Sequence, residues 1–345
     1  MTSAVAARGG RLAKLGLVNS VGLVFVGLGI AWLIWNIVDG PRLFARLLVG
    51  GLSNGALFAL IALGYTMVYG IIELINFAHG DLFMLGAVMG AIMLEQWFGQ
   101  TKSSPTGWIL LAVAMLGAMA FCAAVNVVIE RFAYRRLRNA PKLAPLITAV
   151  GVSFILQNIG IRINGSAPHS RTSVLPTKEI SVGGVGIRVA YIVVIAITVP
   201  LLLFMTWLVQ KTKIGKAMRA TAQDRDAARL MGIDVDKIIS FTFALGGALA
   251  GAAGMLFVEV NRRTSYDLGF RLGLIAFTAA VLGGVGNLLG AVIGGVFIGV
   301  IQALNDGAPH GLGQEWTQTV MFSILILMII FRPGGLFGKH AQEKV

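Results

Sequence analysis

Long apolar stretches recur from one end of this chain to the other, and they constrain its fold more than any other feature. A helix needs about 20 mostly apolar residues to cross a bilayer. With 57% hydrophobic and only 12% charged residues, the chain lacks the polar groups that cover a water-soluble domain. We therefore predict an all-α, polytopic transmembrane helical bundle. The clearest candidate spans are roughly Leu15–Val38, Leu47–Tyr69, Leu82–Trp97, Trp108–Ile129, Leu143–Ile161, Ala190–Val209, Ile238–Val258 and Thr317–Phe331.

A further apolar stretch, Leu272–Leu304, is long enough for more than one helix. Three clustered glycines interrupt it: Gly283, Gly284 and Gly286. Such a cluster favours two shorter helical pieces, or one crossing and a re-entrant segment, with exposed backbone that lines a pathway. Gly286, Gly290 and Gly294 are also four residues apart, which predicts one helix face suited to close packing. We expect about nine or ten membrane passes, with at least one glycine-broken helix.

The first candidate span begins directly after a basic N-terminus that carries Arg8, Arg11 and Lys14. That order is typical of a secretory signal peptide. The apolar run is too long for one, however, and no small-x-small cleavage site follows it. We expect a retained signal anchor with the N-terminus in the cytoplasm.

The formal net charge of +13 is concentrated in the loops. With the N-terminus inside, 18 of the 28 Lys and Arg residues fall in cytoplasmic segments, which is the bias of the positive-inside rule. The C-terminus is then also cytoplasmic, provided that Leu272–Leu304 crosses an even number of times. The charge indicates orientation in a membrane rather than binding of nucleic acid, since nucleic-acid-binding chains carry charge throughout.

The loop Gln210–Ile239 is the most informative soluble stretch. Good helix formers occupy Ala217–Met231, and Gly232 supplies a stop signal. This pattern predicts a short helix–turn–helix with an apolar tip of Leu230, Met231 and Ile233. The tip fits a groove on a cytoplasmic partner, and the alternative is a solvated basic loop held at the lipid headgroups.

The segment Glu73-Leu-Ile-Asn-Phe-Ala-His-Gly-Asp81 places several polar groups beside an apolar run. Such groups are costly near a membrane unless they face protein, water or substrate. A structural turn, in which Asn76, His79 and Asp81 satisfy the ends of broken helices, is the favoured interpretation. The alternative is a proton or ion relay through Glu73, His79 and Asp81. The other histidines are scattered without ligand spacing, so no metal site is expected.

Enzyme signatures are absent from the sequence. It has no Walker-type phosphate loop, no Gly-x-Ser-x-Gly, no His-Glu-x-x-His and no paired cysteines, since Cys122 is the only cysteine. If the chain takes part in active transport, the energy must come from an ion gradient or from a separate ATPase.

Three blocks closely resemble the membrane permease subunit of branched-chain amino acid ABC importers of the LivH type. The first is Leu47–Asp81. The second is Glu130-Arg-Phe-Ala-Tyr-Arg-Arg-Leu-Arg138, followed by Leu146–Asn158. The third combines Gly215–Gly232 with Phe277-Thr-Ala-Ala-Val-Leu-Gly-Gly-Val-Gly286. The resemblance covers roughly Leu47–Gly335.

The resemblance implies a transport subunit that is not itself an enzyme and binds no cofactor. It implies as partners a homologous second permease of the LivM type, two cytoplasmic ATPases that bind ATP and Mg²⁺, and an external solute-binding protein. It also implies that the loop 210–238 contacts an ATPase. The residues expected at that contact are Gly215, Arg219, Asp224, Ala228, Leu230, Met231, Gly232 and Ile233.

A translocation pathway or gate is expected where the polar segment and the glycine cluster lie. The residues expected to form it are Asn54, Tyr65, Glu73, Asn76, Phe77, His79, Asp81, Gly283, Gly284 and Gly286. Residues 47–337 are expected to form the permease domain. Residues 1–46 add an extra span, and residues 338–345 form a cytoplasmic tail.

Three alternatives remain at this point. The first is an ABC permease for urea or short amides, a branch that tends to have Met where Phe77 stands. The second is an ion-coupled secondary transporter. The third is a scaffold that transports nothing.

Overall fold

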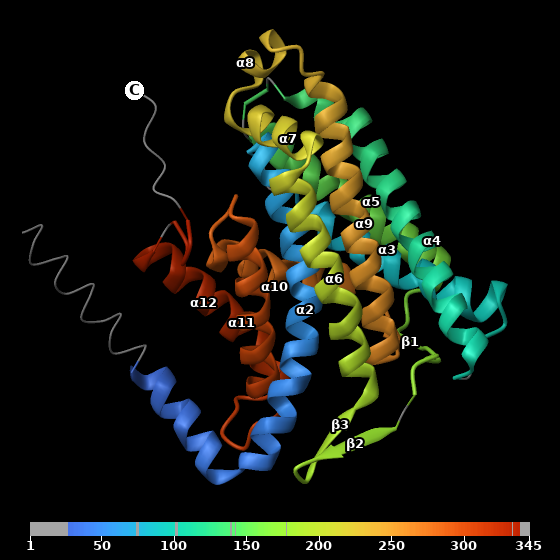
Figure 1. The fold of residues 1–345 in the computed structure, drawn as a ribbon, viewed down its shortest axis with the longest axis vertical. Helices are drawn as coiled ribbons and strands as arrows, with labels where there is room; N and C mark the ends of the chain where they lie inside the picture. The colour runs from blue at the N-terminus through green and yellow to red at the C-terminus, as the bar shows by residue number, and fades with distance from the viewer. Residues whose placement is uncertain are drawn as a thin grey trace, which may run out of the picture.

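The computed structural model describes residues 27–73, 76–100, 103–138, 140–141, 143–176, 178–332 and 334–338, which form a bundle of long helices (Figure 1). Much of the predicted signal anchor, Leu15–Val38, lies outside the described residues. Its described part belongs to a helix over Gly27–Asp39. Residues 339–345 of the predicted tail also lie outside them.

Helices account for nearly all of the described chain. The principal ones are α2 (Pro41–Ile72), α3 (Ala78–Ile92), α4 (Pro105–Ile129), α5 (Leu143–Asn164), α6 (Val189–Lys211), α9 (Val235–Asn261), α10 (Leu268–Gly283), α11 (Leu288–Gly307) and α12 (Thr317–Phe331). Two short helices, α7 (Lys213–Gln223) and α8 (Arg225–Leu230), lie between α6 and α9. Short π or 3₁₀ segments are Met93–Trp97, Glu130–Tyr134, Arg135–Leu137 and Gln314–Trp316.

Eight helices in the described residues are long and apolar enough to cross a membrane, and Gly27–Asp39 and Leu268–Gly283 are shorter apolar helices. This confirms the predicted polytopic helical bundle, whereas the number of passes stays a prediction. Helices α2, α3 and α9 are mostly buried, while α4, α5, α6 and α12 expose most of their apolar residues. Figure 1 shows α12 and α4 on opposite sides of the bundle. The exposed apolar surface of these outer helices is what a lipid environment accommodates.

The predicted break at the glycine cluster is present. Helix α10 ends at Gly283 and α11 begins at Leu288, and between them Gly284 and Gly286 have φ values of 101° and 90°. Glycine adopts this left-handed region without the steric penalty that a Cβ brings. Leu272–Leu304 therefore forms two helices, as predicted.

Close glycine contacts join α11 to both of its neighbours. A Cβ on Gly290 or Gly294 would lie 2.1 Å or 2.2 Å from backbone oxygens of α10, so these two glycines have the predicted packing role. Gly286 does not share their helix face, because it lies in the turn before α11. Gly295 and Gly299 lie on another face of α11, which packs against α2.

The two ends of the bundle carry different structures. One end, called here the hairpin end, bears the antiparallel strands β2 (Glu179–Val182) and β3 (Val185–Arg188), with Glu179 opposite Arg188. Near it, β1 (His169–Ser170) pairs with β4 (Arg263–Thr264). The opposite end, called here the loop end, carries α7 and α8 (Figure 1).

Buried ion pairing holds the segment between α5 and α6 against the bundle at the hairpin end. Arg171 donates to the Glu95 carboxylate at 2.7 Å. Glu259, 1% exposed, accepts from the Ser173 hydroxyl at 2.8 Å and the Val174 amide at 2.9 Å. These bonds stabilise two acidic groups that would otherwise be unfavourable beside apolar helices, although the Glu259 Oε1 atom has no hydrogen-bond partner among the described residues.

Candidate functional site

The loop 210–238 is a helix–turn–helix whose start is fixed by local hydrogen bonds. The Thr212 hydroxyl accepts from the Gly215 amide at 3.1 Å and caps α7. A Cβ at Gly215 would lie 2.2 Å from the Val209 carbonyl oxygen, so glycine permits the sharp turn from α6. The Asp224 carboxylate accepts from the amides of Asp226 and Ala227 at 2.9 Å and 3.0 Å and caps α8. Side-chain caps of this kind stabilise short helices.

The tip of this loop consists of Leu230 and Met231, which are 89% and 82% exposed. Gly232 follows with a φ of 80° and turns the chain toward α9. Ala228, 3% exposed, anchors α8 on the bundle. Ile233 differs from its predicted place in the tip, because it packs against the buried core.

Two arginines of the loop cap the ends of helices in the bundle. Arg219 donates to the Val209 carbonyl in the last turn of α6. Arg225 donates to the Ile71 carbonyl in the last turn of α2 at 2.8 Å. Burial, together with neighbouring Arg138, lowers the pKa of the Arg225 guanidinium. Cations at helix C-termini satisfy free carbonyls and interact favourably with the helix dipole.

At the start of α3, His79 is fully buried between helices. A Cβ on Gly64 of α2 would lie 2.5 Å from its Nε2 atom, and one on Gly246 of α9 would lie 3.5 Å from its ring. The Tyr65 ring meets it edge-on, with centroids 4.6 Å apart. Among the described residues, no hydrogen bond joins His79 to Asp81 or Glu73, so these side chains do not form a continuous relay.

Asp81 is fully buried where α3 and α10 meet. The Ser153 hydroxyl of α5 donates to its Oδ2 atom at 2.5 Å. Its backbone lies against the start of α10, where a Cβ on Gly269 would be 2.7 Å from the Asp81 Cα atom. A carboxylate near helix N-termini is favoured by the helix dipole. The Asp81 side chain caps neither α3 nor α10, so its predicted role in satisfying the ends of broken helices stays a prediction.

Asn76 is positioned by a residue that the sequence analysis did not single out. The Tyr134 hydroxyl donates to its Oδ1 atom at 2.8 Å, and Tyr134 packs on Phe243 with ring centroids 5.7 Å apart. Tyr134 ends the short π segment that begins at Glu130, whose buried carboxylate accepts from the Ser240 hydroxyl at 2.6 Å. Glu130 and Tyr134 lie in the Glu130–Arg138 block, which resembles the LivH-type permeases. That resemblance was the sequence signal that could have identified these two residues.

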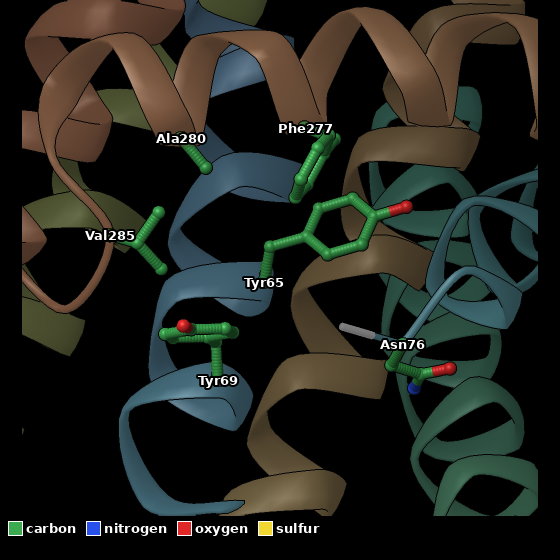
Figure 2. Close-up of a pocket in the computed structure, with 6 residues that line it drawn as sticks. All are labelled: Tyr65, Tyr69, Asn76, Phe277, Ala280 and Val285. Carbon is green, nitrogen blue, oxygen red and sulfur yellow. The ribbon is translucent and has the colours of Figure 1, made fainter. Parts of the chain in front are cut away.

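A small pocket lies beside Asn76 toward the loop end. It encloses about 240 Å³, including space open to the outside. Figure 2 shows Tyr65 and Tyr69 projecting from successive turns of α2, with Phe277 and Ala280 of α10 opposite. The lining residues are Tyr65, Tyr69, Asn76, Phe277, Ala280 and Val285. The lining is apolar and aromatic with an amide group at its edge, and the space between these side chains holds about one water-sized group in this conformation.

The structure brings five of the residues expected in the pathway into one region. Tyr65 contacts His79 and Phe277, Phe77 packs near Phe277 with centroids 6.2 Å apart, and Asn76 lines the same pocket. Asp81 follows two residues after His79. The five are Tyr65, Asn76, Phe77, His79 and Asp81.

Two other expected residues lie apart from this region. Asn54 is roughly 22 Å from Tyr69 along α2, at 1.5 Å per residue. Glu73 is exposed and ends α2 in a left-handed conformation, with a φ of 55°. Neither residue shares the buried surroundings of His79.

The glycine break borders the pocket through Val285, but its backbone is partly covered. The Leu336 amide donates to the Leu282 carbonyl at 2.8 Å, and the Phe337 amide to the Gly283 carbonyl at 3.3 Å. A Cβ on Gly284 would lie 2.7 Å from the Gly338 nitrogen. The expectation that Gly283 and Gly284 expose backbone to a pathway therefore differs from the structure, in which the end of the chain packs over them.

An apolar helical bundle with a charged, capped loop and an exposed apolar tip at one end is the architecture of a polytopic integral membrane protein. Among the described residues, no group of three or more His, Cys, Asp or Glu side chains is placed to hold a metal ion. A family model described as "Branched-chain amino acid transport system / permease component" matches residues 47–330. The chain belongs to this family of transport permeases.

Individual relatives agree with this assignment. The chain is 37% identical over 307 residues to the high-affinity branched-chain amino acid transport system permease protein LivH of Escherichia coli K12, covering 88% of this chain and 98% of that protein. It is 38% identical over 308 residues to the corresponding permease BraD of Pseudomonas aeruginosa, with the same coverage. A probable LivH of Methanocaldococcus jannaschii is 28% identical over 85% of this chain and 92% of its own length. No solved structure matches the chain significantly.

Proposed function

We propose that this chain is the permease subunit of an ATP-driven importer that carries branched-chain or other hydrophobic amino acids into the cytoplasm. The observation that carries this proposal is the exposed Leu230–Met231 tip on a capped, rigid loop, in a chain of this permease family. Large apolar side chains that are almost fully exposed on a charged loop mark a contact site for another protein.

The partners follow from the proposed function. The complex has two ATPase subunits that bind ATP and Mg²⁺, and one of them receives the tip. A homologous permease of the LivM type completes the membrane unit, and an external solute-binding protein delivers the amino acid. In this proposal ATP is hydrolysed by the partner ATPases and not by this chain. In the proposed orientation the loop end faces the cytoplasm, the hairpin end faces outward, and both chain termini are expected on the cytoplasmic side of the inner membrane.

The relatives support branched-chain amino acids over the alternative substrates. Phe277, Ala280 and Val285 give the pocket an apolar wall, but Tyr65, Tyr69 and Asn76 add hydroxyl and amide groups, so the lining alone does not separate a branched aliphatic side chain from urea. The named relatives are branched-chain amino acid permeases. An ion relay has less support, because His79 is bonded to neither carboxylate in the described residues.

Uptake measured in a strain that lacks this permease tests the substrate. Restoring the gene together with its partner subunits is expected to restore ATP-dependent uptake of radiolabelled leucine and not of radiolabelled urea. A variant of the partner ATPase that cannot hydrolyse ATP serves as the control and should remove leucine uptake. Restored uptake of urea alone, or leucine uptake that persists without ATP, would contradict the proposal.

Cysteine labelling tests the orientation. The only native cysteine, Cys122, is buried, so a cysteine introduced at Leu230 gives a clean signal. A membrane-impermeant maleimide is expected to label Leu230→Cys only in inside-out vesicles, because the loop end faces the cytoplasm. A cysteine at Val182 in the exposed hairpin is the matched control and should be labelled only in right-side-out vesicles. The reverse pattern would invert the proposed orientation.

A further inference from the structure

Arg225 connects the loop at residues 210–238 to the C-terminal turn of α2. Its guanidinium donates to the Ile71 carbonyl at 2.8 Å, across 154 residues of sequence. Ile71 lies in the last turn of α2 and is 5% exposed. Carbonyls in the last turn of a helix have no partner within the helix, so Arg225 supplies a charged donor where the backbone needs one.

The last turn of α2 connects this contact to the pocket. The Glu73 amide donates to the Tyr69 carbonyl at 2.7 Å and closes the helix, so Tyr69, Ile71 and Glu73 form one hydrogen-bonded turn. Tyr69 is also part of the pocket wall (Figure 2). A force on the Ile71 carbonyl therefore acts on the turn that carries Tyr69.

On the loop side, Arg225 is rigidly connected to the tip. Arg225 and Leu230 are the first and last residues of α8, a separation of roughly 7.5 Å at 1.5 Å per residue. The Asp224 cap fixes the start of this helix, and Ala228 seats it on the bundle. The tip and Arg225 therefore move as one unit.

We propose that Arg225 is a positioning residue that transmits displacement of the Leu230–Met231 tip to the last turn of α2 and thereby to the pocket wall at Tyr69. This inference rests on the proposed function, because an ATPase must displace the tip. Arg219 makes the comparable bond to Val209 of α6, a helix that contributes no residue to the lining of this pocket. Helix α7 also packs against α2, but Arg225 supplies the hydrogen bond from the loop to the turn that carries Tyr69.

The test compares transport with ATP hydrolysis in the assembled complex. Arg225→Gln, reconstituted with its partner subunits in liposomes, is expected to retain its bound ATPase because the tip is unchanged. The number of ATP molecules hydrolysed per leucine imported should rise about tenfold, as expected when a hydrogen bond from a charged donor is lost. Arg225→Lys keeps a cationic donor, so the ratio should return toward the wild-type value.

Arg229→Gln is the matched control. Arg229 lies on the same short helix and pairs only locally with Asp226 at 3.2 Å, so its removal should leave the ratio unchanged. An unchanged ratio in Arg225→Gln would overturn the inference. So would a reduced amount of assembled complex with a normal ratio in both Arg225 variants, since that result means a purely structural role. A wild-type complex that imports no leucine would instead refute the proposed function.

Discussion

Replacing Met231 with Asp is expected to abolish amino acid uptake while the protein still folds and inserts. Met231 is 82% exposed in the isolated chain, so a carboxylate there remains in water and costs the fold little. In the proposed complex the same position is enclosed by an apolar groove of the ATPase. Burying an unpaired charge costs several kcal/mol, which corresponds to at least about a hundredfold weaker docking.

The measurement pairs leucine uptake with co-purification of the ATPase from detergent extracts. Met231→Asp should lose both, and Leu230→Asp should behave in the same way because it is the other half of the tip. Arg229→Gln changes the net charge by the same single unit without altering the apolar tip, so it should retain both. An unreduced amount of ATPase bound to the Met231→Asp protein would count against the tip as the docking contact.

Sequence alone predicted most of the helices because the bilayer imposes a length and a composition on each crossing. The glycine cluster at Gly283–Gly286 was also informative, since residues with positive φ cannot continue a helix. The helix–turn–helix was predicted from its helix formers and from Gly232, whereas the caps that Thr212 and Asp224 supply were found only in the structure. In each case the determining interaction is local in sequence.

The arrangement of the helices was less predictable. Helices α2 and α4 are both long and apolar, yet α2 is buried and α4 faces outward. Hydropathy does not separate them, because protein interior and lipid are equally apolar. Small residues are a better indicator of which helix faces are buried. The spacing of Gly286, Gly290 and Gly294, however, indicated only the face of α11 that packs on α10. The register of Gly295 and Gly299, which contacts α2, was missed.

The candidate site was predicted only in part for the same reason. Asn76, His79 and Asp81 stood out as polar residues in an apolar setting, and the structure places them in one buried region. Their partners Tyr134 and Ser153 lie 58 and 72 residues further along the chain. Those pairings depend on the packing of α4 and α5 against α3, which no local pattern encodes.

The α2–α11 contact leads to the second large expected effect, because it leaves no room for a side chain. A Cβ on Gly55 would lie 2.7 Å from the Val296 Cα atom and 2.9 Å from the Val296 carbonyl oxygen. From the other side, a Cβ on Gly299 would lie 2.2 Å from the Gly55 Cα atom. Backbone atoms cannot move aside as a flexible side chain can, so any larger residue must separate the two helices.

Gly55→Val is therefore expected to prevent stable folding. Overpacking a well-packed core typically costs about 1–3 kcal/mol, and the cost should exceed that range where the obstacle is backbone. Folded protein, measured as the monodisperse peak in size-exclusion chromatography of detergent extracts, should fall at least about tenfold. Gly70→Val is the matched control in the same helix, because nothing lies within 4 Å of a Cβ at Gly70. Equal yields of the two variants would mean that α2 and α11 do not pack this closely.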